Sequence, residues 1–249
     1  MKLEVRDLKK IFRTGTSSLP TLNGLSLSVD EGEFVSLIGP SGCGKSTAFN
    51  VISGLEAPDT GEVLVDGRVI TEETGHVSYM LQKDLLLPWR SVVDNAILAA
   101  EVRGESKKAA RERVRELLPV FGLEEFAGAY PAKLSGGMRQ RVALLRTVMA
   151  DRDIWLLDEP FGALDAMTRD RMQQWLLGIF RQFRPAVLFI THSIEEAVYL
   201  SDRVYVLSDR PASVKKEVQI DLPRPRNREI VTDEHFLHYK KQLLGELYE

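Results

Sequence analysis

One short stretch of the sequence has the residue types and the spacing of a phosphate-binding loop. It reads GPSGCGKST, from Gly39 to Thr47, and follows the apolar run FVSLI. Glycines let the backbone N–H groups of such a loop turn toward an anion, and the helix that follows offers its partially positive N-terminus. In this pattern Lys45 reaches the β- and γ-phosphates and the hydroxyl of Ser46 binds Mg²⁺. The stretch predicts a site for a nucleoside triphosphate; the alternative is a glycine-rich turn that binds nothing.

Two adjacent carboxylates close a later apolar run. In IWLLDE, Asp158 ends the run and Glu159 follows it. A Mg²⁺-dependent hydrolase needs a carboxylate at the end of a neighbouring strand, so Asp158 is expected to hold the ion, directly or through water. Glu159 would face the γ-phosphate and orient or deprotonate the attacking water. The alternative is a polar strand end before a turn at Pro160.

Both features need strands that end at the same edge of a sheet, and the apolar pattern predicts such strands. Short apolar runs flanked by helical segments suit strands that are buried on both faces of a parallel sheet. Runs of this kind, and others with the alternation typical of strands, lie at residues 2–8, 22–39, 61–67, 153–158, 186–191 and 202–208. The chain therefore reads as a β-rich start followed by an α/β core.

A helical segment separates the two parts of this core. Residues 106–123 carry apolar side chains at helical spacing, namely Val114, Leu117, Leu118 and Phe121. Most of the other positions are charged, as on a solvated helix face. Pro119 is expected to cost this helix a hydrogen bond or to end it early.

The composition argues against several classes of function. The chain has 249 residues, 44% of them hydrophobic and 28% charged, and a net charge of −3. It lacks the basic balance typical of nucleic-acid-binding proteins, and no apolar run reaches the roughly 18 residues that a membrane-spanning helix needs. The start of the chain has no signal-peptide centre, and a single cysteine excludes an internal disulfide. We expect a cytoplasmic chain without a nucleic-acid partner.

A third motif, LSGGMRQR at residues 134–141, connects the first two. Together with GPSGCGKST, LLDEP and ITH it resembles the ATP-binding cassette (ABC) family, and the motifs occur in the family's order between Leu3 and Ser208. The resemblance implies an α/β P-loop NTPase cassette with a β-rich N-terminal subdomain, a RecA-like core and an inserted helical subdomain. It also implies an ATPase that uses ATP and Mg²⁺.

The resemblance further implies how the chain is divided. We expect one ABC ATP-binding domain over residues 1–249, with the helical subdomain at about 88–150 and a C-terminal extension at 211–249. The extension is too short for the regulatory domain found on some sugar-importer cassettes. We assign it no role.

Single residues receive roles from the same resemblance. Phe12 matches the aromatic side chain that stacks on adenine, although a phenylalanine at a strand end could also belong to the core. Gln82 matches the glutamine that reaches Mg²⁺ and the attacking water, and His192 matches the histidine that contacts the γ-phosphate. The expected ATP-binding residues are Phe12, Gly39, Pro40, Ser41, Gly42, Cys43, Gly44, Lys45, Ser46 and Thr47. The expected metal site comprises Ser46, Gln82 and Asp158, and the expected catalytic residues are Glu159, His192 and Gln82.

The signature motif implies a second copy of the chain. A serine and two glycines before a helix form another helix start that accepts an anion. In this family the signature closes over the γ-phosphate of the opposite subunit; the matching residues here are Leu134, Ser135, Gly136, Gly137 and Met138. Asp165 matches the loop that crosses between subunits. The resemblance thus implies a head-to-tail dimer that encloses two ATP molecules, either a homodimer or a heterodimer with a similar chain.

Three classes of ABC protein differ in what the hydrolysis drives. Nucleic-acid-processing cassettes insert coiled coils or zinc modules, whereas residues 45–158 contain no heptads and the whole chain has only one cysteine. Translation-associated cassettes carry two cassettes per chain, and this chain has one. The transporter class fits best, and YPAKLSGG is similar to the importer version of the signature, although free-standing exporter cassettes exist. A soluble ATPase without a membrane partner is the alternative.

One stretch narrows the resemblance within the importers. LQKDLLLPWRSVVDNAILAAEVRG, together with FGALDAMTR and VLSDRPASV, resembles the nitrate, sulfonate and taurine importer group, which also includes importers of thiamine-pyrimidine precursors. The implied partners are membrane permease subunits that dock near Gln82–Trp89 and, indirectly, an extracytoplasmic solute-binding protein. The chain would then lie on the inner face of the cell membrane. The apolar run Leu85–Trp89 could receive a permease helix or belong to the core.

The single cysteine, Cys43, lies inside the phosphate-binding stretch. Because Lys45 and a helix N-terminus are close, we expect a reactive thiol whose alkylation blocks ATP binding and which ATP protects. The alternative is a small residue that only fits the loop.

Overall fold

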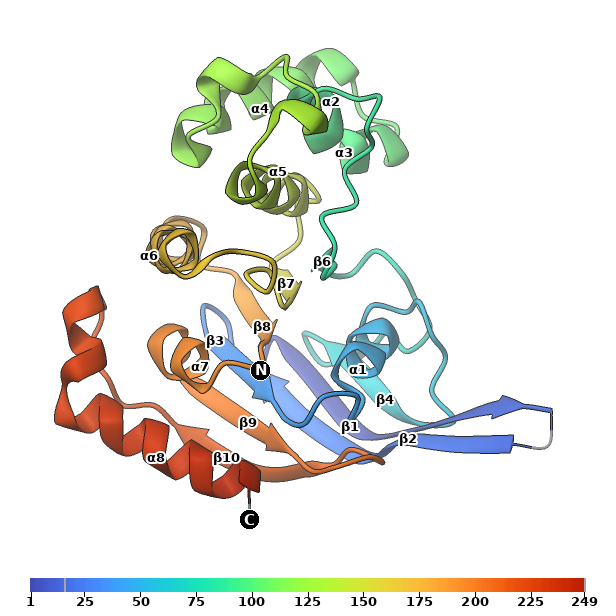
Figure 1. Ribbon diagram of the computed structural model, residues 1–249. Coiled ribbons are helices and arrows are strands. Elements are labelled where there is room, and N and C mark those ends of the chain that lie inside the picture. The colour runs from blue at the N-terminus through green and yellow to red at the C-terminus, as the bar shows by residue number, and fades with distance from the viewer. Residues whose placement is uncertain (16, 249) are drawn as a thin grey trace.

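The computed structural model describes residues 1–15 and 17–248 and shows two β-sheets with helices around them (Figure 1). The smaller sheet is antiparallel and has the strand order β2-β1-β4-β5. Its strands are β1 (Leu3–Thr14), β2 (Ser17–Val29), β4 (Thr60–Val65) and β5 (Arg68–Val69). The β-rich start of the chain is therefore confirmed.

The larger sheet has the strand order β10-β9-β3-β8-β7-β6. Its strands are β3 (Phe34–Ile38), β6 (Ser78–Met80), β7 (Ile154–Asp158), β8 (Ala186–Ile190), β9 (Arg203–Leu207) and β10 (Val214–Gln219). Neighbouring strands are parallel except for β10, which runs antiparallel to β9. This order brings the ends of β3, β7 and β8 to one edge, where the chemistry was expected.

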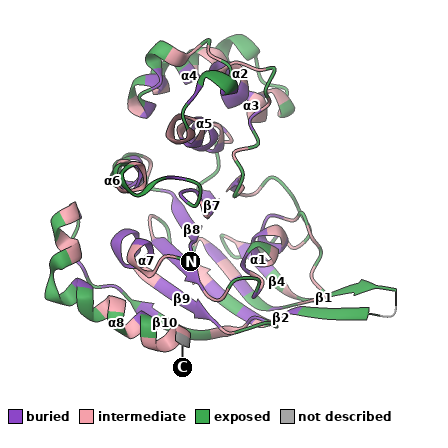
Figure 2. Cartoon of the chain, viewed as in Figure 1, coloured by how far each residue is buried: buried purple, intermediate pink, exposed green. Residues whose placement is uncertain are grey.

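The three central strands β3, β7 and β8 are buried along their whole length, and Figure 2 shows β7 and β8 in purple. Their mostly apolar sequences, with Ser36 within β3 and Asp158 at the end of β7, suit this position because both faces of the sheet are covered. Alternate side chains enter two core clusters: Phe34 and Phe189 face the helices α5 and α6, whereas Val35 and Leu188 face α1 and the smaller sheet. The strands expected at 153–158 and 186–191 are confirmed.

The helices fall into two groups (Figure 1). Beside the larger sheet lie α1 (Lys45–Ile52), α6 (Ala166–Phe183) and α7 (Ile194–Leu200). The second group comprises α2 (Val92–Ala96), α3 (Leu98–Val102), α4 (Lys107–Phe121) and α5 (Gly136–Val148), with short 3₁₀ turns at Glu124–Phe126 and Pro131–Lys133; of these four helices α5 contacts β6 of the larger sheet. Because these four helices lie within residues 88–150, we propose that they form one helical subdomain. No helix in the described ranges is long and apolar enough to cross a membrane.

The sequence around helix α4 determines where this helix begins and ends. The hydroxyl of Ser106 accepts a hydrogen bond from the N–H of Ala109 at its start, and Gly122 ends it in the left-handed conformation with φ of +60°. Pro119 lies inside the helix, which continues to Phe121. The proline thus costs a hydrogen bond without ending the helix, because it lies in the last turn.

The C-terminal segment is tied closely to the core. β10 completes the larger sheet, so the segment that begins at residue 211 is not a separate appendage. It continues through a 3₁₀ turn (Arg228–Thr232) to α8 (Glu234–Tyr248). The fully buried guanidinium of Arg226 donates at 2.7–3.1 Å to three carbonyls at the C-terminal end of α7, those of Val198, Tyr199 and Ser201. These bonds fasten the segment to the helix that follows His192.

Candidate nucleotide-binding site

The stretch Gly39–Thr47 joins the end of β3 to the start of α1, as its sequence predicted. Gly42 and Gly44 have φ values of +75° and +130°, which residues with a side chain rarely adopt. A Cβ on Gly44 would also lie 2.9 Å from the carbonyl oxygen of Thr21. The shape of the loop therefore requires both glycines.

The same loop has what a phosphate group needs. The Nζ atom of Lys45 donates hydrogen bonds to the carbonyls of Gly39 and Pro40 at 2.7 and 2.8 Å, so the ammonium is held at the loop. Helix α1 begins without a side-chain cap, which leaves its first N–H groups for an anion. A positive charge and unpaired donors converge here, and the residues fit the phosphates of a nucleotide.

Asp158 ends β7 and lies almost fully buried near Ser46. Burial raises the pKa of Asp158, and the nearby charge of Glu159 adds to the increase, whereas the Ser46 hydroxyl and Lys45 act in the opposite direction. A cation bound beside such a buried carboxyl group would stabilise its ionised form. Proteins bind Mg²⁺ through one or two oxygen side chains plus the phosphates of the substrate, and Asp158 with Ser46 fits that donor set.

Two residues that are far apart in the sequence, Gln82 and His192, both lie next to the carboxylate of Glu159. The Nε2 atom of Gln82 donates to its Oε2 atom at 3.0 Å, and Nδ1 of His192 lies 3.4 Å from the same oxygen. Glu159 has a φ of +44°, in the left-handed region, and its N–H donates to the carbonyl of Ile190 at 3.0 Å. A sharp turn after β7 therefore aims the carboxylate at the residues expected to act with it.

A hollow of about 460 Å³ lies over the loop, a size suited to a small-molecule ligand. Many of the residues expected to bind ATP or to act in catalysis line this hollow, namely Phe12, Ser41, Gly42, Gly44, Lys45, Ser46, Thr47, Gln82, Glu159 and His192. Phe12 is 37% exposed, with the ammonium of Lys10 5.1 Å from its ring centroid, so the core interpretation of Phe12 is wrong.

Three further residues line the hollow that the sequence did not single out: Leu19, Thr21 and Arg210. Leu19 pairs with Phe12 across the β1–β2 hairpin, which places both side chains at one end of the hollow. Only the register of the hairpin reveals this neighbour. Arg210 comes from the turn after β9, and its position depends on the larger sheet rather than on a local motif.

The signature motif does not share this hollow. None of the five residues from Leu134 to Met138 is among the described residues that line it. The hydroxyl of Ser135 instead caps helix α5 by accepting a hydrogen bond from the N–H of Met138 at 3.2 Å. Asp165 caps α6 in the same way, through the N–H of Thr168 at 3.0 Å. Both motifs start helices, and neither is among the described residues that line the hollow over the phosphate loop.

Lys45 lies near the Cys43 thiol as expected, with Nζ 3.9 Å from the sulfur, but the thiol is buried, which argues against the expected reactivity in this conformation. Cys43 is 1% exposed, and its sulfur points into the core cluster beneath the loop, near Gly39. The interpretation of Cys43 as a small residue that fits the loop is favoured, because a reagent needs access to the sulfur.

We therefore expect slow labelling of Cys43. In the native protein a thiol-reactive dye should modify this one cysteine far more slowly than in protein unfolded by urea, with or without Mg-ATP. The measurement is the labelling rate, with the unfolded protein as the control. Rapid labelling that Mg-ATP prevents would instead show an exposed thiol in the loop.

Comparisons with known proteins agree with this site. A family model described as "ABC transporter" matches residues 22–162. The chain is 44% identical to an uncharacterised ABC transporter ATP-binding protein of Methanocaldococcus jannaschii, over 98% of this chain and 91% of that protein. It is 38% identical to an aliphatic sulfonates import ATP-binding protein of Bacillus cereus (98% and 95% covered). It is 39% identical to a nitrate import ATP-binding protein of Synechocystis sp. (98% and 94% covered).

A solved structure supports the same assignment. The dimeric ATP-binding cassette MJ0796, in a post-hydrolysis state bound to ADP and Pi, matches with a TM-score of 0.77 and 29% identity. The match covers 89% of this chain and 100% of that one. With its phosphate loop, its carboxylate pair and a signature helix in one α/β P-loop fold, the chain belongs to the ABC transporter family and is an ATP-binding cassette that hydrolyses ATP with Mg²⁺.

Proposed function

We propose that the chain is the ATP-hydrolysing subunit of an ABC importer and drives uptake of a small solute through separate membrane subunits. The observation that carries the catalytic part is the meeting of Gln82, Glu159 and His192 at one carboxylate oxygen beside the phosphate loop. The import names of two relatives, each aligned over 98% of this chain, support the transport part.

The proposed mechanism divides the work among the residues of the site. Lys45 and the N–H groups at the start of α1 hold the phosphates, and Phe12 offers its ring to the adenine. Ser46, Asp158 and Gln82 hold Mg²⁺, which neutralises charge on the phosphates when it is bound. Glu159 accepts a proton from the attacking water or orients it. His192, 58% exposed at the edge of the hollow, contacts the γ-phosphate.

Ser135 and its neighbours act on the ATP of a second copy of the chain. The absence of Leu134–Met138 from the described lining of the hollow supports this proposal, because a site that lacks its signature needs another chain to supply it. The dimeric state of MJ0796 supports it as well. In such a dimer Asp165 lies in the loop that crosses between subunits.

The apolar run after Gln82 is the proposed docking surface for a membrane subunit. Leu86 is buried and belongs to the core, whereas Leu85 and Trp89 are 53% and 71% exposed. The core and docking interpretations thus apply to different residues of the same run. Large exposed apolar side chains this close together are typical of interaction sites.

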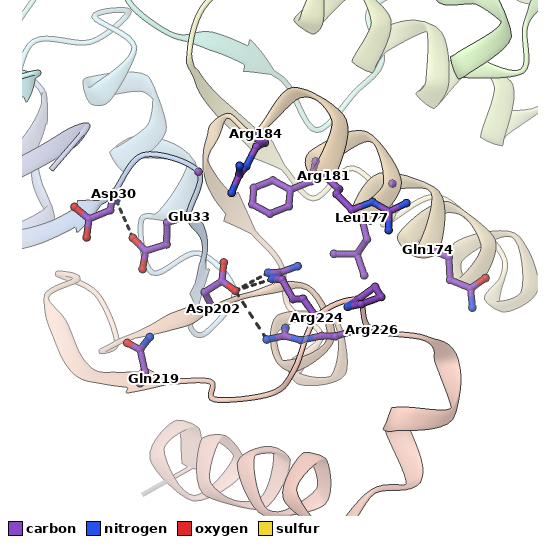
Figure 3. A pocket seen from close by; sticks show the side chains of 14 residues that line it. Asp30, Glu33, Gln174, Leu177, Arg181, Arg184, Asp202, Gln219, Arg224 and Arg226 are labelled. Atoms are coloured by element: carbon purple, nitrogen blue, oxygen red, sulfur yellow. Dashed lines mark hydrogen bonds and ion pairs between the residues drawn. The ribbon is translucent and has the colours of Figure 1, made fainter.

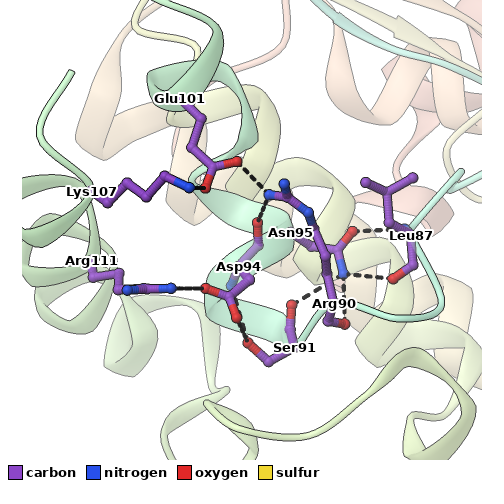
Figure 4. Close-up of polar contacts among 8 residues, drawn as sticks. All are labelled: Leu87, Arg90, Ser91, Asp94, Asn95, Glu101, Lys107 and Arg111. Carbon is purple, nitrogen blue, oxygen red and sulfur yellow. Dashed lines mark hydrogen bonds and ion pairs between the residues drawn. The ribbon is translucent and has the colours of Figure 1, made fainter. Parts of the chain in front are cut away.

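The side chain of Asn95 is hydrogen-bonded to the backbone of the loop that carries Trp89 (Figure 4). Its amide is fully buried, accepts a hydrogen bond from the N–H of Leu87 at 2.8 Å and donates at 3.0–3.1 Å to the carbonyls of Leu87, Arg90 and Ser91. Every bond reaches backbone, so the loop that presents Trp89 has a fixed form before any partner binds. A preformed surface loses less entropy on binding.

The Trp89→Ala variant tests the docking surface. Because large aromatic side chains often dominate binding energy at an interface, we expect co-purification with the permease subunits, and uptake by the complex, to fall at least about tenfold. The ATPase rate of the isolated subunit should stay unchanged. Val102→Ala is the matched control, since Val102 is 82% exposed on α3, outside the run. Equal losses in both variants, or none in Trp89→Ala, would argue against this surface.

The solute is proposed to be a small anion or zwitterion of the nitrate, sulfonate or taurine type, from the names of the relatives. The test is uptake by cells that express the cassette with the permease and solute-binding protein encoded beside it. Uptake of nitrate, an alkanesulfonate or taurine supports the proposal, and uptake of a thiamine-pyrimidine precursor alone selects the alternative. If no membrane subunit co-purifies with the chain, it acts as a soluble ATPase instead.

A further inference from the structure

A second hollow, of about 840 Å³, lies at the opposite edge of the larger sheet from the phosphate loop. The phosphate loop follows the end of β3, whereas this hollow is lined by residues just before β3 and β9, such as Glu33 and Asp202. Figure 3 shows Arg181 and Arg184 on one side of it and Arg224 and Arg226 near Asp202. We call it the arginine pocket, after these four residues. Its volume suits a small-molecule ligand.

The carboxylates of the arginine pocket are already paired. Each has a cationic partner: Asp202 with Arg224 (2.8 Å), Glu33 with Arg203 (2.8 Å) and Asp30 with the amino group of Met1 (3.3 Å). No carboxylate within residues 1–15 and 17–247 forms an ion pair with Arg181 or Arg184. The pocket therefore holds more positive charge than its own acids neutralise.

Arg226 adds a buried charge to this excess. Its side chain is fully buried, its guanidinium donates to backbone carbonyls, and its Nε atom has no partner in the described structure. The nearest carboxylate, that of Asp202, is 4.0 Å away and already pairs with Arg224. Burial lowers the pKa of Arg226 to about 10, and the charge of Arg224 acts in the same direction. An anion in the pocket would relieve this repulsion.

One face of α6 forms a wall of the arginine pocket. Gln174, Leu177, Gly178 and Arg181 all line it, at the spacing that places residues on the same side of a helix. A glycine inside a helix is destabilising relative to alanine, and Gly178 has neither a positive φ nor a close neighbour that would require it. A Cβ there would meet nothing within 4 Å, so the missing side chain leaves space in the wall of the pocket.

We propose that the arginine pocket binds a small soluble organic anion. Its carboxylate, sulfonate or phosphate group pairs with the guanidinium of Arg181 or of Arg184, because a guanidinium group binds planar and tetrahedral oxyanions with two hydrogen bonds. Its apolar part lies against Leu177, Phe180 and Pro225, which line the same hollow. The ATPase mechanism uses none of these residues, so this site is additional to the proposed function.

The test uses anilinonaphthalene sulfonate, a fluorescent probe with one sulfonate and an apolar ring system. Wild type should bind it saturably at low salt, and Kd should be at least about tenfold weaker in the double variant Arg181→Gln/Arg184→Gln, which removes both charges. Gly178→Leu fills the space in the wall and should weaken binding to the same extent. Arg171→Gln, an exposed arginine on α6 outside the pocket, is the matched control and should bind as wild type does.

Circular dichroism and the basal ATPase rate show whether each variant is folded. If Gly178→Leu is unfolded, the double arginine variant decides alone. An equal Kd in wild type and in folded pocket variants would overturn the proposal, as would an equal loss in Arg171→Gln. Selective loss in the pocket variants supports it.

Discussion

Replacing Glu159 with glutamine is expected to slow ATP hydrolysis by about a hundredfold to ten-thousandfold while ATP still binds. Glutamine keeps the shape of the side chain but cannot accept the proton of the attacking water. The carboxylate lies at the centre of the site, 3.0 Å from Nε2 of Gln82 and 3.4 Å from Nδ1 of His192. The phosphate loop and Lys45 are untouched by the change, so the affinity for Mg-ATP should stay close to that of wild type.

Two measurements check this expectation. The first is the steady-state release of phosphate, with Glu112→Gln on the exposed face of α4 as a control for loss of one negative charge. The second is the size of the protein with and without Mg-ATP, since ATP that is not hydrolysed should hold two copies together. Turnover near the wild-type rate in Glu159→Gln would exclude a catalytic role for Glu159. It would favour the alternative that Asp158 and Glu159 only form a polar strand end before the turn at Pro160.

The strands of the core could be predicted because their burial leaves a local signature. AVLFI is apolar at every position and IWLLD at every position before Asp158, which suits strands that are covered on both faces. The phosphate loop was predictable for a similar reason: its backbone conformation requires Gly42 and Gly44, and the requirement is visible in the sequence.

Other features depend on long-range packing and have no local signature. The exposure of Leu85 and Trp89 against the burial of Leu86 follows from how one irregular loop sits on its neighbours. The burial of Cys43 follows from the direction of one side chain within a tight loop. The charge excess of the arginine pocket combines α6 with the segment after β10, two parts of the chain that no motif connects.

Two variants that each abolish turnover are expected to restore it when they are mixed. Lys45→Ala removes the ammonium at the phosphate loop, so its own loop should no longer bind ATP tightly. Ser135→Asp keeps the cap of α5, because aspartate is as good a helix cap as serine, but it places a negative charge where the partner's γ-phosphate is expected. Ser135→Thr, another capping residue, is the control and should retain most of its activity.

In a mixed dimer the Ser135→Asp chain supplies an intact phosphate loop and the Lys45→Ala chain supplies an intact signature. These two halves form one complete site, while the other site carries both changes. If dimers exchange freely and the sites act independently, equal amounts should regain about a quarter of wild-type activity, since half of the dimers are mixed and each has one site. A site built from the loop and signature of a single chain would be defective in both variants, and mixing would then recover nothing. The ATPase rate of the mixture therefore decides directly whether Ser135 acts on its own chain or on its partner.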